Sequence, residues 1–180
     1  MTTFIALLRG VNVGKAKRVP MADFRKLLTA LGYTDVATLL NSGNAVFRAR
    51  SGTPARLASA IADAIARKLK VEVPVIVKSS TELAAIVAAN PFKVDETEHS
   101  RFLVAFTQEP KALEDLAVIQ PYIKASERFV IGRHAAYLHF ADGILKSKAG
   151  AALLGKAGRQ ATTRNLATTL KLHALAGKAG

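Results

Sequence analysis

Short hydrophobic runs alternate with helical repeats along the first half of the chain. The apolar run from Thr2 to Leu8 predicts a buried strand. Apolar residues then recur at helical spacing from Met21 to Leu31. Pro20 stands where the start of a helix tolerates proline, and Gly32 is a natural stop. This stretch therefore predicts a strand followed by a helix.

The segment up to residue 77 predicts a hairpin, a second helix and a further strand. Asn and Gly between two strand-like runs are typical of a hairpin turn. A Thr-Pro pair then opens an apolar stripe that repeats every four residues, and a proline in the last run indicates an edge strand. The predicted elements are strands Val36–Leu40 and Ala45–Arg50 around the turn Asn41–Asn44, a helix from Thr53 to Leu69, and the strand Val71–Val77. The order β-α-β-β-α-β is that of a ferredoxin-like unit.

The second half repeats this order approximately, after a connecting helix that begins with the capping box Ser79–Glu82 and stops before Pro91. The closing strand of a second unit is not visible, and Thr162 and Thr163 are interpreted as the start of a last helix. The predicted elements are strands Arg101–Thr107, Glu127–Ile131 and Ala135–Ala141, and helices Pro110–Ile119 and Ile144–Lys156. We therefore predict an α+β fold of two ferredoxin-like subdomains packed as one unit, residues 1–78 and 79–180, the second degenerate.

Cysteine is absent, which excludes disulfides, thiolate metal sites and a cysteine nucleophile, and fits a reducing compartment. The apolar start is interrupted by Arg9, too early for a signal peptide, and no stretch reaches the length of a membrane span. We therefore expect a cytoplasmic protein with no membrane partner.

The charge balance is strongly basic, with 26 Lys and Arg against 13 acids and a formal net charge of +13. No acid follows Asp142, and a second basic cluster lies between Lys15 and Lys26. Such a charge favours nucleic acid or a phosphorylated ligand as partner. The alternative interpretation is a solvated basic surface that keeps the protein soluble.

The loop after the first strand is a candidate anion site. It contains Arg9, Asn12, Gly14, Lys15 and Lys17, and its backbone N–H groups can cradle an anion. It is not a P-loop, because three residues separate its glycines and Ala16 follows the lysine. The alternative is an ordinary β-α connection.

Two further segments carry candidate binding residues. Asn41, Ser42 and Asn44 form a dense set of hydrogen-bonding groups, although the turn alone explains them. We do not expect this turn to converge with the loop around Asn12, since the two segments commonly lie at opposite ends of such a sheet. Near the C-terminus, Thr163, Arg164 and Asn165 are interpreted as a helix start that favours an anion, with Lys148 in the same basic region; ordinary capping is the alternative.

Nothing in the sequence identifies a catalytic residue, a metal site or a cofactor. The 4 histidines show no metal-ligand spacing, and no residue stands out as a general base. The aromatic residues of the second half lack the RNP pattern of RNA-recognition domains, so core packing is their expected role.

Several separate stretches resemble a known family, the domain-of-unknown-function family 1697, in the right order along nearly the whole chain. They are Leu7–Gly14, Val19–Ala22, Asn41–Phe47, Asn90–Phe92, Gly143 with Ser147–Lys148, Thr162–Asn165 and Lys171–Leu172. The resemblance implies a pair of ferredoxin-like subdomains and no established activity. The chain departs from the family at Lys15, where a glycine is usual, and at Leu166, where a tryptophan is usual.

Three functional hypotheses follow from the sequence. The first is an anion-binding module for nucleic acid or a nucleotide-like ligand. The second is a small-molecule enzyme that uses the polar loops as its site. The third is a protein-interaction or homo-oligomeric scaffold with an exposed sheet edge.

Overall fold

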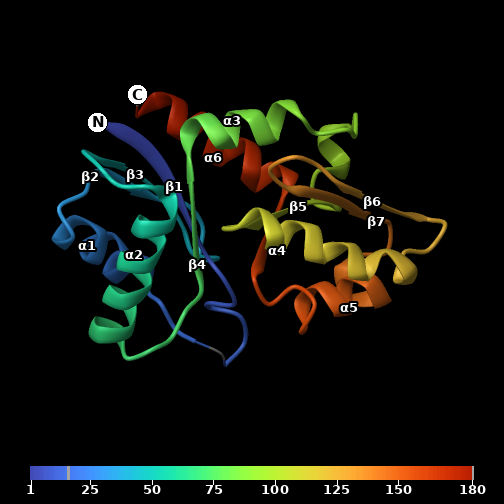
Figure 1. The fold of residues 1–180 in the computed structure, drawn as a ribbon, viewed down its shortest axis with the longest axis horizontal. Helices are drawn as coiled ribbons and strands as arrows, with labels where there is room; N and C mark the ends of the chain where they lie inside the picture. The colour runs from blue at the N-terminus through green and yellow to red at the C-terminus, as the bar shows by residue number, and fades with distance from the viewer. Residues whose placement is uncertain (16, 180) are drawn as a thin grey trace. The chain divides into compact units, whose positions relative to one another are not determined.

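A computed structural model describes residues 1–15 and 17–179 of the chain. Ala16, which enters the P-loop comparison, and Gly180, the end of the second predicted subdomain, lie outside the described residues. The chain divides into two compact units, one of Met1–Leu83 with Leu172–Gly180 and one of Ala84–Lys171. Figure 1 shows the elements of both. In the described part, no helix is long and apolar enough to cross a membrane.

The first unit contains a four-stranded antiparallel sheet in the order β2-β3-β1-β4. Its two helices, α1 and α2, pack on one face of this sheet. There Phe24, Leu28, Ile61 and Ile65 are buried in one cluster with Phe47 of β3. The elements are β1 Thr2–Leu8, α1 Met21–Ala30, β2 Thr34–Thr38, β3 Asn44–Ala49, α2 Pro54–Leu69 and β4 Val75–Ser79.

The second unit has the same strand order, β6-β7-β5-β8. Its helical layer is made of short helices and 3₁₀ turns that bury Leu113, Leu116 and Leu153 against the sheet. The elements are α3 Ser80–Ala88, η1 Glu96–Glu98, β5 Phe102–Thr107, α4 Pro110–Glu114, η2 Asp115–Tyr122, β6 Glu127–Ile131, β7 Ala136–Phe140, η3 Ile144–Lys146, α5 Lys148–Leu154, β8 Ala161–Asn165 and α6 Leu166–Lys178. Helices α3 and α6 each cross the boundary between the units.

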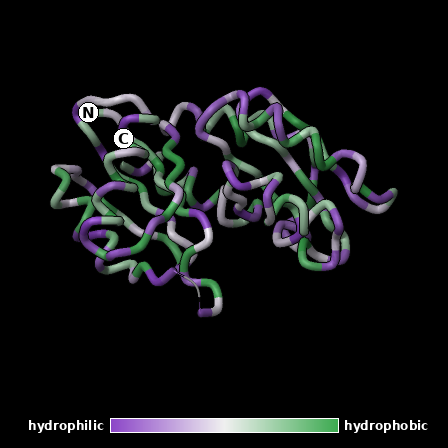
Figure 2. The backbone as a smooth tube through the Cα atoms, turned by 60° about the horizontal axis from the view of Figure 1, so that its bottom comes forward, coloured by the Kyte–Doolittle hydropathy of each residue, from purple (hydrophilic) through white to green (hydrophobic). Residues whose placement is uncertain are grey.

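The predicted α+β class and the two ferredoxin-like sheets are confirmed. Each sheet joins its four strands through three antiparallel pairs, and the two strand orders are equivalent. The capping box is also present, since Ser79 N–H donates to Glu82 Oε2 at 2.8 Å and Glu82 N–H donates to Ser79 Oγ at 3.1 Å. Figure 2 shows hydrophobic and hydrophilic stretches alternating along the chain.

Two predicted elements of the second half are wrong. The helix expected over 144–156 is split, because Ser147 is extended and its hydroxyl caps α5 by accepting from Gly150 N–H at 3.1 Å. The closing strand of the second sheet exists: it is β8, which pairs with β5 from Leu103–Asn165 to Thr107–Ala161. Thr and Asn residues favour helix caps locally, but in β8 long-range pairing decides the conformation.

Candidate functional site

The loop between β1 and α1 and the turn between β2 and β3 lie at the same end of the first sheet. Both β1 and β2 pair antiparallel with β3, so they run parallel to each other and end on the same side. The expectation that the two segments lie at opposite ends is therefore wrong. The first segment follows the end of β1 and the second follows the end of β2, so the topology brings them together.

Asn12 holds these two segments together. Its Nδ2 donates to the carbonyl oxygens of Asn41 at 2.7 Å and Val19 at 2.8 Å. Its Oδ1 accepts from Val19 N–H at 2.9 Å. Asn12 itself has a left-handed φ of 57°, which asparagine tolerates better than most residues. The side chain is therefore used as a structural brace and fixes both ends of the loop.

The turn residues have a similar bracing role. Gly43 accepts a hydrogen bond from Leu8 N–H at 2.8 Å, and it has a φ of 83°. A Cβ at Gly43 would stand 2.6 Å from Leu8 Cβ, so only glycine fits this close approach. Asn44 is fully buried, and its Nδ2 donates to Leu39 O and to Ser42 Oγ, each at 2.8 Å. The side-chain amides of Asn12 and Asn44 are therefore engaged within the protein, whereas Asn41 and Ser42 are exposed.

The cations of this region lie on or beside these hydrogen-bonded segments. Lys15, Lys17 and Arg18 are exposed, and Arg9 is half-buried, with its backbone N–H bonded to Pro74 O at 3.0 Å. The C-terminal end of α2 lies at the same end of the sheet, because α2 starts after β3 and leads back to the start of β4. It adds the exposed Lys68 and Lys70. We call this surface the basic end of the first unit: Arg9, Lys15, Lys17, Arg18, Lys68 and Lys70.

Gly10 and Gly14 shape the loop that carries these cations. Their φ values are 66° and 57°, and no heavy atom beyond the neighbouring residues lies within 4 Å of a Cβ built at either position. Their role is therefore conformational: with Asn12 between them, they turn the backbone in a left-handed sense at alternate positions. The N–H of Asn12, between the two glycines, donates to Lys17 O at 2.9 Å, so this group is used within the loop.

The segment Thr162–Asn165 does not form the predicted helix start. It is the strand β8, and only its last residue caps α6, through Thr168 N–H donating to Asn165 Oδ1 at 2.8 Å. Thr163 is half-buried, and Lys148 is exposed at the start of α5. These residues belong to the second unit, whereas the other candidates belong to the first.

Arg164 is buried, with 7% of its surface exposed. Its Nη1 donates to Thr162 Oγ1 and to Thr163 O, each at 2.8 Å. Burial lowers the pKa of its guanidinium to about 10, because the charged form is removed from water. This arginine is an internal part of the second unit and not an exposed phosphate-binding side chain.

The sequence prediction missed a cavity of about 550 Å³ in the second unit. It lies between η2 and α5, beside the loop that leads to β8, and Tyr122, Lys156 and Arg159 line it. No motif marks these residues, and the β6–β7 hairpin, η3 and α5 separate Tyr122 from Lys156 and Arg159 in the sequence. The short helices that leave the cavity open were themselves predicted as longer ones. Within residues 1–15 and 17–179, no three His, Cys, Asp or Glu side chains form a group that could hold a metal ion.

Comparison with known proteins agrees with the fold and gives no activity. The family model described as protein of unknown function (DUF1697) matches residues 1–137. The chain is similar to the conserved bacterial protein SP0830 from Streptococcus pneumoniae, with 22% identity and a TM-score of 0.79 over 97% of this chain and 98% of that chain. No curated protein sequence matches the chain.

Proposed function

Because this chain belongs to the DUF1697 family, whose function is unknown, we propose a function from its own geometry: it binds nucleic acid through the basic end of the first unit. The phosphate backbone would be the group recognised. Lysine and arginine side chains neutralise phosphates and release their counterions, which supplies most of the affinity in sequence-independent binding.

The observation that carries this proposal is a run of exposed cations in a segment whose two ends are tied together. Lys15 and Lys17 are exposed and lie between Asn12 and Val19, and Asn12 bonds to Val19 at 2.8 and 2.9 Å. A segment whose ends are fixed before binding loses less conformational entropy when it meets its ligand. Between Leu8 and Met21 the chain carries Arg9, Lys15, Lys17 and Arg18 and no acid.

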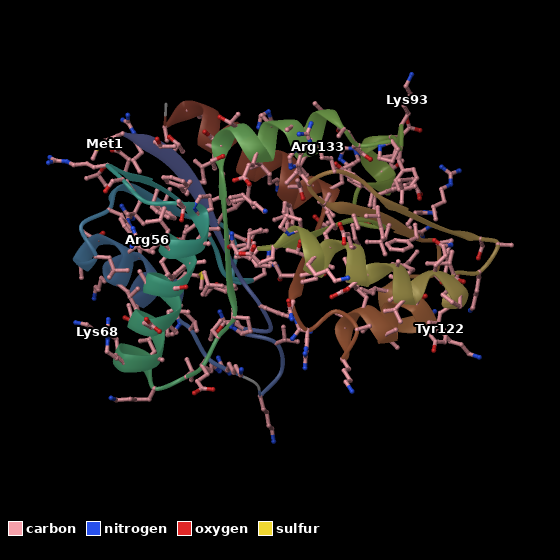
Figure 3. All side chains as sticks on the ribbon, in the orientation of Figure 1. Met1, Arg56, Lys68, Lys93, Tyr122 and Arg133 are labelled. Carbon is pink, nitrogen blue, oxygen red and sulfur yellow. The ribbon has the colours of Figure 1, made fainter. Side chains whose placement is uncertain are left out.

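The surroundings extend the same positive surface. A hollow of about 400 Å³ between α1 and α2 is lined by Lys26 and Lys68 together with one acid, Asp23. Figure 3 shows Lys68 extending outward at the end of α2. An extended polyanion that contacts the loop would therefore meet further lysines along the two helices.

The test is fluorescence anisotropy with short single-stranded RNA and with duplex DNA at two salt concentrations. The wild type should bind both, and its affinity should fall steeply with salt. Lys15→Ala combined with Lys17→Ala should weaken binding about tenfold and reduce the salt slope by about two, one for each lost phosphate contact.

The matched control is Lys93→Ala, which removes an exposed cation from the second unit, where Figure 3 shows it pointing outward. It should leave the affinity within about twofold of the wild type. No binding at low salt, or an equal loss in Lys93→Ala, would refute the assignment to the basic end.

A further inference from the structure

The cavity of the second unit has the size and composition of a small-molecule site. Its volume of about 550 Å³ lies within the range of about 300–1,000 Å³ for ligand pockets. Ala112 of α4, Val118 of η2 and Ala152 of α5 contribute an apolar wall. The two α-helices that line the cavity are short, since α4 and α5 have only 5 and 7 residues.

Large apolar side chains stay exposed at this cavity. Val118 is 57% exposed and Tyr122 is 51% exposed, although most large hydrophobic residues of the second unit are buried. Figure 3 shows Tyr122 at the edge of the unit. An exposed aromatic ring beside an apolar wall is a suitable surface for a flat apolar group to stack on.

One side of the cavity is cationic. Lys156 and Arg159 line it from the loop between α5 and β8. Gly158 fixes the path of this loop, because a Cβ there would overlap the carbonyl oxygen of Leu153. The acid of the cavity, Asp115, is already paired with Lys111 at 2.8 Å. The carbonyl oxygens at the end of α5 are partly satisfied by Gly155 N–H, which bonds Ala151 O at 3.0 Å and Ala152 O at 3.2 Å.

We propose that this cavity binds a small organic anion with a flat apolar body. The apolar group lies against Val118 and the ring of Tyr122, and the anionic group is held by Lys156 and Arg159. A carboxylate, a sulfonate or a phosphate fits this description equally, because the guanidinium of arginine binds each through paired hydrogen bonds. The site shares no residue with the basic end of the first unit, so the two proposals stand or fail separately.

The probe for this site is 8-anilinonaphthalene-1-sulfonate, which combines a flat aromatic body with one negative charge. Its fluorescence is titrated against the wild type and the double variant Lys156→Gln/Arg159→Gln. The wild type should bind one probe per chain, and the double variant should bind it at least tenfold more weakly. The neutral analogue 1-anilinonaphthalene should bind the wild type more weakly than the sulfonate does.

A second variant tests the cavity itself. Ala151 lines it and is exposed on α5, so Ala151→Phe fills the space from the solvent side without overpacking the core. It should abolish probe binding while the far-ultraviolet circular dichroism is unchanged. The control is Lys124→Gln, an exposed cation of the same unit that does not line the cavity, and it should bind like the wild type.

Three results would overturn the proposal. They are no saturable binding of the sulfonate by the wild type, unchanged affinity in folded Ala151→Phe, and equal affinity for the neutral and the anionic probe. If Ala151→Phe does not fold, the double variant decides the question, because both of its substitutions are at exposed positions.

Discussion

The two units have the same sheet topology and differ in what connects their strands. In the first unit, residues 9–20 join β1 to α1, whereas in the second unit only residues 108–109 join β5 to α4. The helices differ as well, since α1 and α2 have 10 and 16 residues, and α4 and α5 have 5 and 7. The long connection carries four of the six cations of the basic end, and the short helices line the cavity. One architecture thus supports two different candidate sites, because function is placed on connections.

The comparison is first tested at the hairpin turns. Gly43→Ala should destabilise the first unit by about 3 kcal/mol, because the new Cβ meets Leu8 and the left-handed backbone is strained. The matched Gly132→Ala should lower the free energy of unfolding by about 1 kcal/mol, since its Cβ would meet Tyr137 at 2.9 Å and Ala135 O at 3.0 Å but its backbone is not left-handed. Urea denaturation followed by circular dichroism measures both. Equal losses would contradict the view that only the first unit depends on a tightly braced turn.

The next test compares a buried with an exposed cation. Arg164→Ala should destabilise the second unit by about 3 kcal/mol, because it leaves a cavity and removes two hydrogen bonds of 2.8 Å. Lys17→Ala should change stability by less than about 0.5 kcal/mol, because the side chain is exposed. Hydrogen exchange, resolved by peptide, locates the loss. Arg164→Met, which keeps most of the stem, should lose less than the alanine variant. If Arg164→Ala leaves the free energy of unfolding unchanged, the structural role of this arginine is refuted.

A smaller effect is expected at the brace of the first unit. Asn12→Ala removes three hydrogen bonds and should lower the free energy of unfolding by about 2 kcal/mol. Amide exchange should rise in the segments around Val19 and Asn41. Asn12→Gly also removes these hydrogen bonds but relieves the strain of the left-handed φ. Comparing it with Asn12→Ala therefore separates the contribution of backbone strain from that of the hydrogen bonds. If Asn12→Gly restores full stability, the side-chain bonds contribute nothing.

The smallest expected effects distinguish the helix caps of the two units. Ser147→Ala should cost about 1 kcal/mol, because this buried hydroxyl caps α5 at 3.1 Å. Thr53→Ala should cost about 0.5 kcal/mol, because the exposed Thr53 hydroxyl accepts from Arg56 N–H at a longer 3.4 Å. Thermal unfolding compares the two variants. A reversed order would show that burial does not set the strength of these caps.

The fold was largely predictable from local patterns. The strand Thr2–Leu8 and the strand Glu127–Ile131 were predicted with their observed bounds, because apolar runs and alternation specify them directly. The strand β8 was missed because its sequence, Ala-Thr-Thr-Arg-Asn, has the residue types of a helix cap. Only its pairing with β5 makes it a strand, and a pairing over such a separation leaves no local signal.

The sequence identified several residues that matter in the structure, but it predicted the role of each less well. Asn12 was identified as part of an anion-binding loop and Asn44 as part of a dense set of hydrogen-bonding groups, and the structure shows that both side-chain amides bond within the protein. Arg164 was interpreted as an exposed phosphate ligand, because a basic residue beside threonines is normally at the surface. The structure instead places it in the strand β8, opposite Val104 of β5, with 7% of its surface exposed. The cavity around Tyr122 had no signal at all, since it results from how short two helices are.

The division of the chain has a consequence for its synthesis. The first unit contains both Met1–Leu83 and Leu172–Gly180, with the whole second unit between them. At roughly 5–20 residues per second, a ribosome needs several seconds to translate the intervening segment. The first unit is thus the first to begin folding and the last to receive all of its residues. Until translation reaches α6, the nascent first unit must persist without its final helical turns.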